Sequence, residues 1–394
     1  MPTAHQVALI KNETMVSRRL PKDTLMSKIG LKAMIAAQPF LVTAPGRVCL
    51  FGEHSDYIGL PVIPGAIDRC ITISGKPGEG SEIRVLYSDL KQADSFRIGE
   101  NLSYRQRRDY LRSAFNVVAR QGLIPRTGAE LAIAGNIPIA GGLSSSSALT
   151  VASVMTAAHL AGEDLDPERL ANLAFQAEVR EFGESGGMMD HFASAYGGLI
   201  HVDCGRQNKL TRIAASLDGL VIGDSQEKKK DTVGDLTTIR ATVEDGYRRL
   251  SKAIPGFNQR ETPLKLVSKH IDTLPLDCRL MTLTTIRNRD LTARALKVLS
   301  SKKPDPRIVG SMLNEHHVLL RDGLHRSTAR IEELISAAKA AGALGCKING
   351  SGGGGTMLAY APGHEKEVAE AIRKVGGIPY LTRIGQGAKL TAVK

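Results

Sequence analysis

The chain has 394 residues and a formal net charge of +12; 42% of its residues are hydrophobic, 23% are charged and 4% are aromatic. These values exclude a disordered or low-complexity protein, and the length favours two lobes with a cleft over one small core. No stretch of about 18 apolar residues occurs, which argues against a membrane-spanning helix. The basic runs at 105–108 and 228–230 have no Trp or nucleic-acid-binding motif beside them, so we interpret them as solvated faces.

The cysteines are five in number, widely spaced and without a CxxC pair: Cys49, Cys70, Cys204, Cys278 and Cys346. This pattern indicates free thiols rather than disulfides or a zinc site, so we expect a cytoplasmic protein. Residues 1–38 lack the apolar core of a secretory signal, and we interpret them as a basic N-terminal extension that is amphipathic from Leu25 to Ile35.

The first part of the chain is predicted to form a sheet. Apolar residues alternate or run together from Phe40 to Leu50, a polar turn spans 52–59, and the apolar run 61–67 predicts a strand or a short helix. Further strands are expected at 70–74, 82–88 and 129–134, with a helix at 104–120 before the last of them.

The middle of the chain is predicted to be mainly helical. A Gly/Ser loop beginning at 136 leads into a helix that ends near 162, and its many small residues predict close packing in the interior. A second helix is expected at 167–182, because Asp166 can cap it and Pro167 suits its first position. Glycines at 183–187 interrupt it, and a helix at 188–196 and a strand at 199–202 follow.

Beyond residue 205 the pattern changes to a strand at 217–223, a basic loop at 225–231 and helices as far as about 340. Two short strands flank a glycine tract at 350–355, and a last helix is expected at 363–375. We therefore predict an α+β protein with a cleft, divided into the extension 1–38 and two lobes, 39–205 and 206–394.

The loop G-G-L-S-S-S-S-A at 141–148 has the features of an anion site. Its glycines expose backbone N–H groups, its serines supply hydroxyls, and the N-terminus of an apolar helix follows directly. A serine-capped helix after a glycine turn would give a similar sequence. The loop is not a Walker motif, because it lacks Gly-Lys-Ser/Thr.

The second glycine tract, at 350–355, matches G-x-G-x-x-G by its letters only. A dinucleotide site needs a strand before the glycines and a helix after them, whereas residues 356–360 resemble a strand. We therefore expect this tract to support the phosphate loop through close backbone contact rather than to bind a dinucleotide.

Polar side chains gather between the first two apolar runs, at Arg47, Glu53, His54 and Asp56. Such alternating donors and acceptors suit a hydroxylated ligand, although isolated charges in a loop are usually solvated. Glu178 and Asp190 lie on either side of the glycine break. One carboxylate can serve as a Mg²⁺ ligand and the other can orient or deprotonate an attacking hydroxyl.

Together these segments resemble the GHMP small-molecule kinases, named for galactokinase, homoserine kinase, mevalonate kinase and phosphomevalonate kinase. The resemblance rests on A-P-G-R-V-C-L-F-G-E-H-S-D-Y at 44–57, G-G-L-S-S-S-S-A at 141–148 and K-I-N-G-S-G-G-G-G-T at 347–356. Within the family, G-E-H-S-D-Y and the later P-V-I-P-G-A-I-D are most similar to galactokinases. The family fold implies a mixed-sheet first lobe with the phosphate loop and a ferredoxin-like second lobe.

The resemblance also implies a role for each matching residue. Asp190 falls on the catalytic base, with Arg47 beside it. Sugar contacts fall on Glu53, His54, Asp56 and Gly187, and Mg²⁺ ligands on Glu178 with Ser145 or Ser146. The loop around the ATP phosphates comprises Gly141, Gly142, Leu143, Ser144, Ser145, Ser146 and Ser147.

The chain departs from the galactokinase pattern at three positions. Leu236 stands near the place of a Tyr that packs on the sugar, His191 follows the catalytic Asp in place of Gln, and Cys49 replaces a common Asn. These changes leave room for a related hexose, pentose or uronic acid as substrate.

We therefore expect an ATP-dependent kinase with Mg²⁺ that phosphorylates a sugar, at the anomeric hydroxyl of galactose or a relative. The alternatives are a mevalonate or heptose-phosphate kinase of the same family, or a non-catalytic sensor of sugar and ATP. Retention of Arg47, Glu178 and Asp190 argues against the sensor. We expect a small-molecule partner and neither nucleic acid nor membrane.

Overall fold

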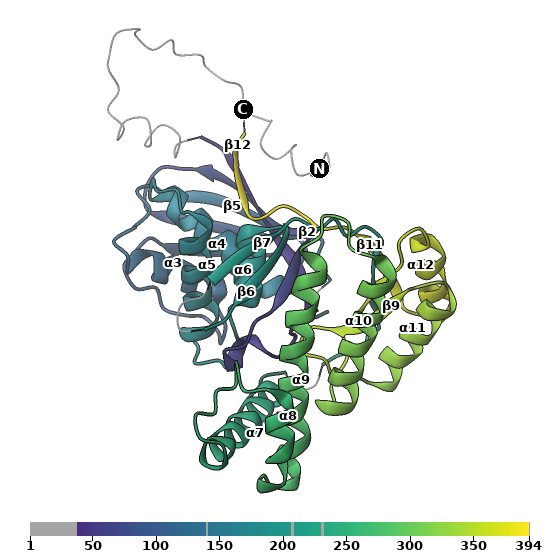
Figure 1. Cartoon of the computed structure of the whole chain (residues 1–394). Coiled ribbons are helices and arrows are strands. Elements are labelled where there is room, and N and C mark those ends of the chain that lie inside the picture. Colours follow the sequence, from purple (N-terminus) through teal and green to yellow (C-terminus); the bar gives the residue numbers. More distant parts are fainter. Residues whose placement is uncertain (1–37, 139–140, 206–208, 230–231, 394) are drawn as a thin grey trace.

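The computed structural model describes residues 38–138, 141–205, 209–229 and 232–393. Two sheets and their helices build two lobes, which confirms the α+β prediction (Figure 1). The amphipathic stretch expected at 25–35 lies outside the described residues. None of the helices within the described part is long and apolar enough to cross a membrane.

The first sheet has eight strands, in the order β12-β1-β2-β5-β3-β4, with β6 paired to β2 and β7 paired to β6. Among the described strands of this sheet, β3 and β5 run parallel and the other pairs are antiparallel, so the sheet is mixed. The strands are β1 (Phe40–Phe51), β2 (Ile63–Pro77), β3 (Glu82–Tyr87), β4 (Gln92–Arg97), β5 (Ala129–Gly135), β6 (Leu199–Asp203), β7 (Lys209–Ile213) and β12 (Lys389–Ala392).

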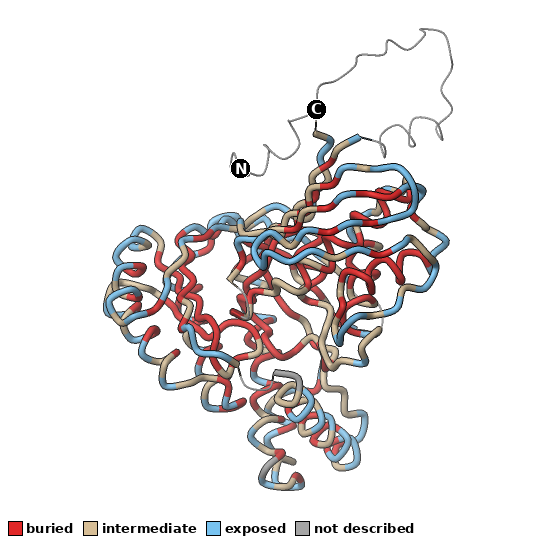
Figure 2. Tube along the Cα trace, turned by 180° about the vertical axis from the view of Figure 1, so that it is seen from behind, coloured by how far each residue is buried: buried red, intermediate tan, exposed pale blue. Residues whose placement is uncertain are grey.

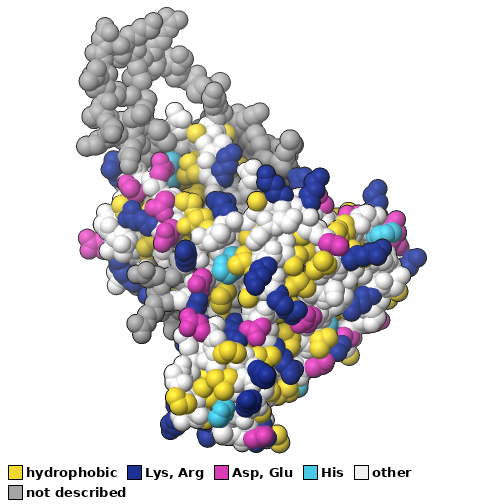
Figure 3. All heavy atoms as spheres, in the orientation of Figure 1, with side chains coloured by type: hydrophobic (Ala, Val, Ile, Leu, Met, Phe, Trp, Pro, Cys, Tyr) yellow, Lys and Arg dark blue, Asp and Glu magenta, His cyan; other side chains and the backbone are white. Residues whose placement is uncertain are grey.

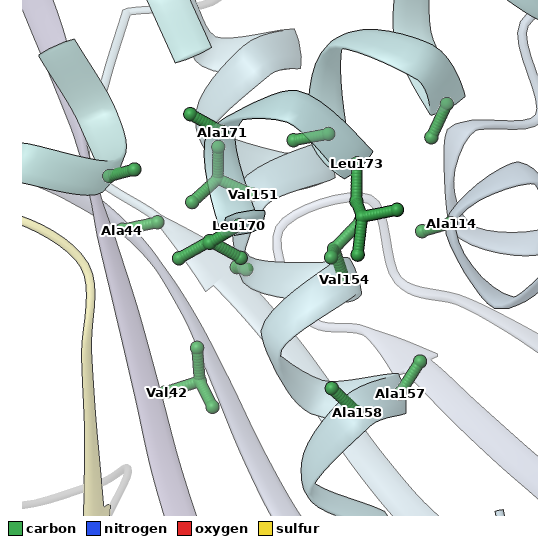
Figure 4. Packing of buried hydrophobic residues seen from close by; sticks show 14 of the residues in the cluster. Val42, Ala44, Ala114, Val151, Val154, Ala157, Ala158, Leu170, Ala171 and Leu173 are labelled. Atoms are coloured by element: carbon green, nitrogen blue, oxygen red, sulfur yellow. The ribbon is translucent and has the colours of Figure 1, made fainter. Parts of the chain in front are cut away.

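Helices pack against this sheet around α4 (Ser145–Leu160), whose small residues allow close approach. Figure 4 shows Val151 and Val154 of α4 against Leu170 and Leu173, with Val42 of β1 on the sheet side. The predicted burial of this helix is confirmed. The other helical elements of the lobe are the 3₁₀ turn η1 (Asp56–Ile58), α3 (Tyr110–Ala119), α5 (Pro167–Phe175), the π-helix η2 (Gln176–Arg180) and α6 (Met189–Tyr196).

The second sheet is antiparallel in the order β11-β8-β10-β9, which is the ferredoxin-like arrangement that the family resemblance implied. Its strands are β8 (Leu220–Asp224), β9 (Gly345–Asn349), β10 (Thr356–Tyr360) and β11 (Ile378–Thr382). The surrounding helical elements are α7 (Thr232–Ala253), α8 (Leu264–Lys269), η3 (Ile271–Thr273), α9 (Leu276–Leu299), α10 (Pro306–Val318), η4 (Leu319–Gly323), α11 (Ala329–Ala340) and α12 (Glu365–Lys374).

Several elements differ from the sequence prediction. The helix expected at 104–120 begins only at Tyr110, because Arg108 has a left-handed backbone and Asp109 caps the helix. The helix expected at 167–182 starts after the Asp166 cap as predicted but changes to a π-helix at Gln176. Strands β4, β7, β11 and β12 were not predicted.

The two lobes are not separated cleanly along the sequence. Strand β7 extends the first sheet beyond residue 205, and β12 at the C-terminal end returns to pair with β1. The division into 39–205 and 206–394 remains a prediction. We propose to place the boundary after β7 and to count β12 with the first lobe.

Both lobes contribute to one hydrophobic cluster, so the junction between them is a core. Val48 and Leu50 of β1 belong to the same cluster as Leu291 of α9 and Leu358 of β10, and all four are fully buried. Figure 2 shows buried residues within each lobe and along the segments that join them. The walls of the cleft between the sheets are therefore held by apolar packing.

The cysteines and the surface charges also bear on the sequence predictions. All five cysteines are free, as predicted, and only Cys70 is partly exposed. On the face drawn in Figure 3, Lys and Arg side chains are interspersed with Asp and Glu. The positive net charge is thus not gathered into one basic patch on that face.

The shared core predicts that the lobes unfold together. Leu358→Ala removes a fully buried side chain and should lower the free energy of unfolding by about 2–5 kcal/mol. Urea unfolding followed by far-UV circular dichroism should show one transition at a lower midpoint. The control Leu276→Ala, at a side chain that is 80% exposed, should change little. Two separate transitions in the wild-type protein would show that the lobes unfold independently.

Candidate active site

A cavity of about 420 Å³ lies where the lobes meet and collects most of the predicted site residues. Its walls come from the loop after β1, the start of α4, the π-helix η2, the start of α6 and the glycine loop after β9. Predicted residues that line it are Arg47, Glu53, His54, Asp56, Gly142, Ser144, Ser145, Ser146, Ser147, Glu178, Gly187 and Asp190. Gly141 and Leu143 do not line it, and Leu143 is buried in the shared core.

A larger hollow of about 750 Å³ lies on the outer face of the first sheet, over β2, β3, β4 and β5. Its charged groups are largely paired with each other, as in the contacts of Arg84 with Glu82 and Glu130 and of Arg105 with Asp94. The smaller cavity is the better candidate because carboxylates, serines and cations converge in it.

The loop at 141–147, which is the predicted phosphate loop, is fixed by hydrogen bonds from the second lobe. Thr356 Oγ1 donates to the carbonyl oxygen of Gly141 at 2.6 Å, and Asn349 Nδ2 donates to that of Gly142 at 2.9 Å. Gly142 has φ +80°, and a Cβ there would lie 2.9 Å from the carbonyl oxygen of Asn349. The second glycine tract therefore packs directly against the phosphate loop, as its composition suggested.

The first turn of α4 is open to an anion. Ser144 precedes the helix with φ 59° and ψ 42°, a left-handed conformation that costs a serine about 1–2 kcal/mol. Its side chain makes no cap hydrogen bond. The first N–H groups of α4 are thus left without a side-chain cap beside the cavity, which favours an anion site over a serine-capped helix.

Arg47 and Asp190 form an ion pair at the centre of the cavity. Arg47 Nε lies 2.7 Å from Asp190 Oδ1, and Arg47 Nη1 donates to the Gly142 carbonyl oxygen at 2.6 Å. Removal from water would raise the pKa of Asp190, but the charge of Arg47 outweighs this effect and holds the pKa below its usual value. Asp190 is therefore a carboxylate at neutral pH and an acceptor of hydrogen bonds.

Asp56 lies close to this pair without a cation of its own. Its Oδ2 accepts a hydrogen bond from the Met189 N–H at 3.3 Å, and a Cβ at Gly187 would lie 2.0 Å from the same oxygen. Burial, and then the negative charge of Asp190, raise the pKa of Asp56 to about 6. Gly187, the glycine predicted to touch the sugar, lines the cavity and also makes room for the Asp56 carboxylate.

Glu53 and His54 are both buried beside Asp56. Glu53 Oε2 lies 2.6 Å from Lys347 Nζ, so a buried ion pair occupies one of its oxygens. His54 Nδ1 lies 2.9 Å from the Tyr57 hydroxyl, and its Nε2 has no partner. Burial, together with the charges of Arg326, Lys347 and Lys229, lowers the pKa of His54 to about 3, so the ring is neutral.

The π-helix η2 carries Glu178 into the cavity, at the kind of helical irregularity that often marks functional sites. Glu178 Oε2 lies 2.7 Å from Nε2 of His191, the residue that follows Asp190 in the sequence. No cluster of three or more His, Cys, Asp or Glu side chains suited to a metal occurs among the described residues. One carboxylate with the nearby serine hydroxyls fits Mg²⁺, which takes most of its ligands from phosphate and water.

Sequence reasoning missed several residues of the cavity, among them one residue in each of the two basic runs. Lys229 and Arg108 were expected on solvated faces, yet both line the cavity, Lys229 next to Ser351 and Arg108 paired with Glu184. Lys228 is exposed as expected, and Lys230 lies outside the described residues. Burial and nearby Arg47 lower the pKa of Lys229 to about 8.

The residues that depart from the galactokinase pattern also lie at the site. Leu236 and His191 line the cavity, whereas Cys49 is buried behind it and donates its backbone N–H to Asn349 Oδ1 at 2.9 Å. Ser185 Oγ lies 3.1 Å from Thr237 Oγ1, next to Leu236. The start of α7 and the glycine-rich loop at 183–187 therefore meet at one side of the cavity.

Fold and site together define a two-lobed α+β protein with a phosphate loop and a paired carboxylate where the lobes join. Family models match residues 109–198 (GHMP kinases N terminal domain), 32–77 (galactokinase galactose-binding signature) and 295–378 (GHMP kinases C terminal). The chain belongs to the GHMP kinases, phosphotransferases of small molecules that use ATP as co-substrate.

Similar proteins include both mevalonate kinases and galactokinases. A mevalonate kinase of Pyrococcus furiosus is 31% identical over 90% of this chain and 98% of its own length. A galactokinase of Pasteurella multocida is 29% identical over 87% of this chain and 90% of its own. The structure of Lactococcus lactis galactokinase with galactose superposes with a TM-score of 0.80, at 22% identity over 91% of this chain and 97% of that one, and supports the fold.

The raised pKa of Asp56 predicts that this carboxylate destabilises the free protein. Its native pKa of about 6 exceeds the unfolded value, so the native state favours the protonated acid, and the cost grows as pH rises from about 4 to about 6. Asp56→Asn should raise the free energy of unfolding by about 1–2 kcal/mol above pH 7, since partial exposure moderates the effect.

Urea unfolding at several pH values checks this expectation, with the exposed Asp218→Asn as the matched control. The gain in Asp56→Asn should shrink below about pH 5. A gain that is independent of pH, or a loss of stability above pH 7, would contradict it.

Proposed function

We propose that this chain is an ATP-dependent sugar kinase that phosphorylates the anomeric hydroxyl of galactose or a related monosaccharide. The observation that carries the proposal is the Asp56 carboxylate, which forms no ion pair among the described residues and lies beside the ionised Asp190. Two neighbouring acceptors suit a neutral ligand with several hydroxyls. The galactose-binding signature over 32–77 supports the same substrate class.

In the proposed reaction Asp190 orients the sugar hydroxyl and accepts its proton. Its lowered pKa makes it a weak base, which suits a loose transition state in which the proton leaves late. Arg47 holds the carboxylate in place and adds positive charge near the transferring phosphoryl group. Glu53, His54 and Asp56 bind the sugar.

The phosphates lie on the open end of α4 in this proposal, against the loop that includes Gly141, Gly142 and Leu143 and the hydroxyls of Ser144 to Ser147. Mg²⁺ would be held by Glu178 with Ser145 or Ser146 and would neutralise charge on the phosphates. Lys229, which lines the cavity and lies against Gly142 of the loop, contacts the phosphates. The free thiols suit a cytoplasmic protein.

Mevalonate is the second candidate, because the mevalonate kinase of Pyrococcus furiosus is 31% identical to this chain. Its carboxylate would need a free cation in the cavity. Arg47 is paired with Asp190 and Arg108 with Glu184, which leaves Lys229 as the remaining cation of the described lining. Placing an anion near Asp56 and Asp190 would cost electrostatic energy, so the charge pattern favours the sugar.

The test is ADP release from Mg-ATP with a panel of sugars, uronic acids, heptose phosphates and mevalonate. Galactose or a close relative should give turnover, and the product should be the sugar 1-phosphate by phosphorus NMR. Asp190→Asn should lower kcat by about 10²–10⁴-fold while nucleotide still binds in calorimetry. Turnover with mevalonate alone would establish the second candidate instead, and nucleotide and sugar binding without turnover would indicate a sensor.

The position of Lys229 gives a separate prediction. Lys229→Met removes a positive charge from the cavity wall and should lower kcat/KM for ATP by about 10²-fold, because a charge aimed at the phosphates acts in a water-poor site. The exposed neighbour offers a matched control, Lys228→Met, which should retain wild-type kinetics. Equal effects of the two substitutions would refute a specific role for Lys229.

A further inference from the structure

Strand β9 of the second lobe sends two polar side chains into the first lobe. Lys347 and Asn349 stand two positions apart on one strand, so they point to the same side. Both are fully buried at 0% exposure. A buried lysine is costly unless it is paired, so its contacts deserve a functional explanation.

Lys347 reaches the substrate side of the cavity. Its Nζ lies 2.6 Å from Glu53 Oε2 and donates to the carbonyl oxygen of Cys49 at 2.8 Å. The backbone of the same glutamate is also held, because Asn288 Nδ2 donates to the Glu53 carbonyl oxygen at 2.9 Å. Because Lys347 fixes Oε2, it sets the direction in which the other oxygen, Oε1, can accept a hydrogen bond from a ligand in the cavity that Glu53 lines.

Asn349 reaches the phosphate side. Its Nδ2 donates to the Gly142 carbonyl oxygen at 2.9 Å, and its Oδ1 accepts the Cys49 N–H at 2.9 Å. The C=O and N–H of one trans peptide point in opposite directions. Holding the Gly142 carbonyl therefore also fixes the direction of the Leu143 N–H in the phosphate loop.

We infer that Lys347 and Asn349 are positioning residues with divided tasks: Lys347 orients Glu53 for the sugar, and Asn349 orients the phosphate loop for the nucleotide. The inference rests on the proposed function, because the proposed function places the sugar next to Glu53. Cys49 connects the two, since it gives its carbonyl to Lys347 and its N–H to Asn349. One strand of the second lobe thus sets the geometry of both substrate sites in the first.

The divided tasks predict opposite kinetic effects from two substitutions of similar size. Lys347→Met should raise the KM for the sugar by about tenfold and leave the calorimetric Kd for ADP within about twofold. Asn349→Leu should raise the Kd for ADP by about tenfold and change the sugar KM much less. The exposed Lys366→Met is the control and should change neither. All measurements are made well below the Tm of each variant.

A double-mutant cycle tests whether Lys347 acts through Glu53. Glu53→Gln alone should raise the sugar KM, and adding Lys347→Met to it should give no further rise. The double variant also removes both buried charges together, so it should fold even if Lys347→Met alone does not.

The outcomes separate this inference from the proposed function. Wild-type protein without sugar-dependent turnover would overturn the proposed function and the inference with it. Wild-type turnover combined with multiplying effects of Lys347→Met and Glu53→Gln would overturn the inference alone. Equal losses of sugar and nucleotide affinity in both single variants would also overturn it, because a merely structural role moves both together.

Discussion

The geometry of the cavity depends on the guanidinium of Arg47. Its Nε pairs with Asp190 at the start of α6, and its Nη1 donates a hydrogen bond to the Gly142 carbonyl oxygen in the predicted phosphate loop. Arg47 itself belongs to β1, so three segments far apart in the sequence meet at one planar, permanently charged group. This contact places the proposed proton acceptor and the loop proposed for the phosphates at a set distance from each other, which is the main requirement for phosphoryl transfer.

The second lobe supplies rigidity to this arrangement rather than most of its chemistry. Gly141 and Gly142 are held by Thr356 and Asn349, and Glu53 is held by Lys347. The shared apolar cluster keeps the two sheets together so that these bonds persist. Buried polar contacts of this kind add little net stability, but they select one geometry when every partner is satisfied.

Site residues that lie in short sequence motifs could be predicted from the sequence. Site residues whose positions depend on contacts with distant parts of the chain could not. Glycines and serines around 141–147 and the charges at 47–56 were readable because their composition is unusual. The position of Lys229 in the cavity was not, because it depends on contacts with Ser351 and Gly142, which are distant in the sequence. A π-helix at Glu178 and the pairing of β12 with β1 depend on tertiary contacts that no local pattern records.

In the proposed function, kinase chemistry and substrate choice reside in different elements of this fold, which is consistent with similar identity to a mevalonate kinase and to a galactokinase. Asp190 and the serines come from the starts of α6 and α4, whereas Asp56 comes from the short turn after β1. Overall identity of 31% or 29% averages over the whole chain and says little about one turn. The charge state of Asp56 beside Asp190 bears directly on whether the cavity accepts a neutral polyol or an anion, so in the proposed function the substrate depends on that pair of carboxylates more than on the remaining sequence.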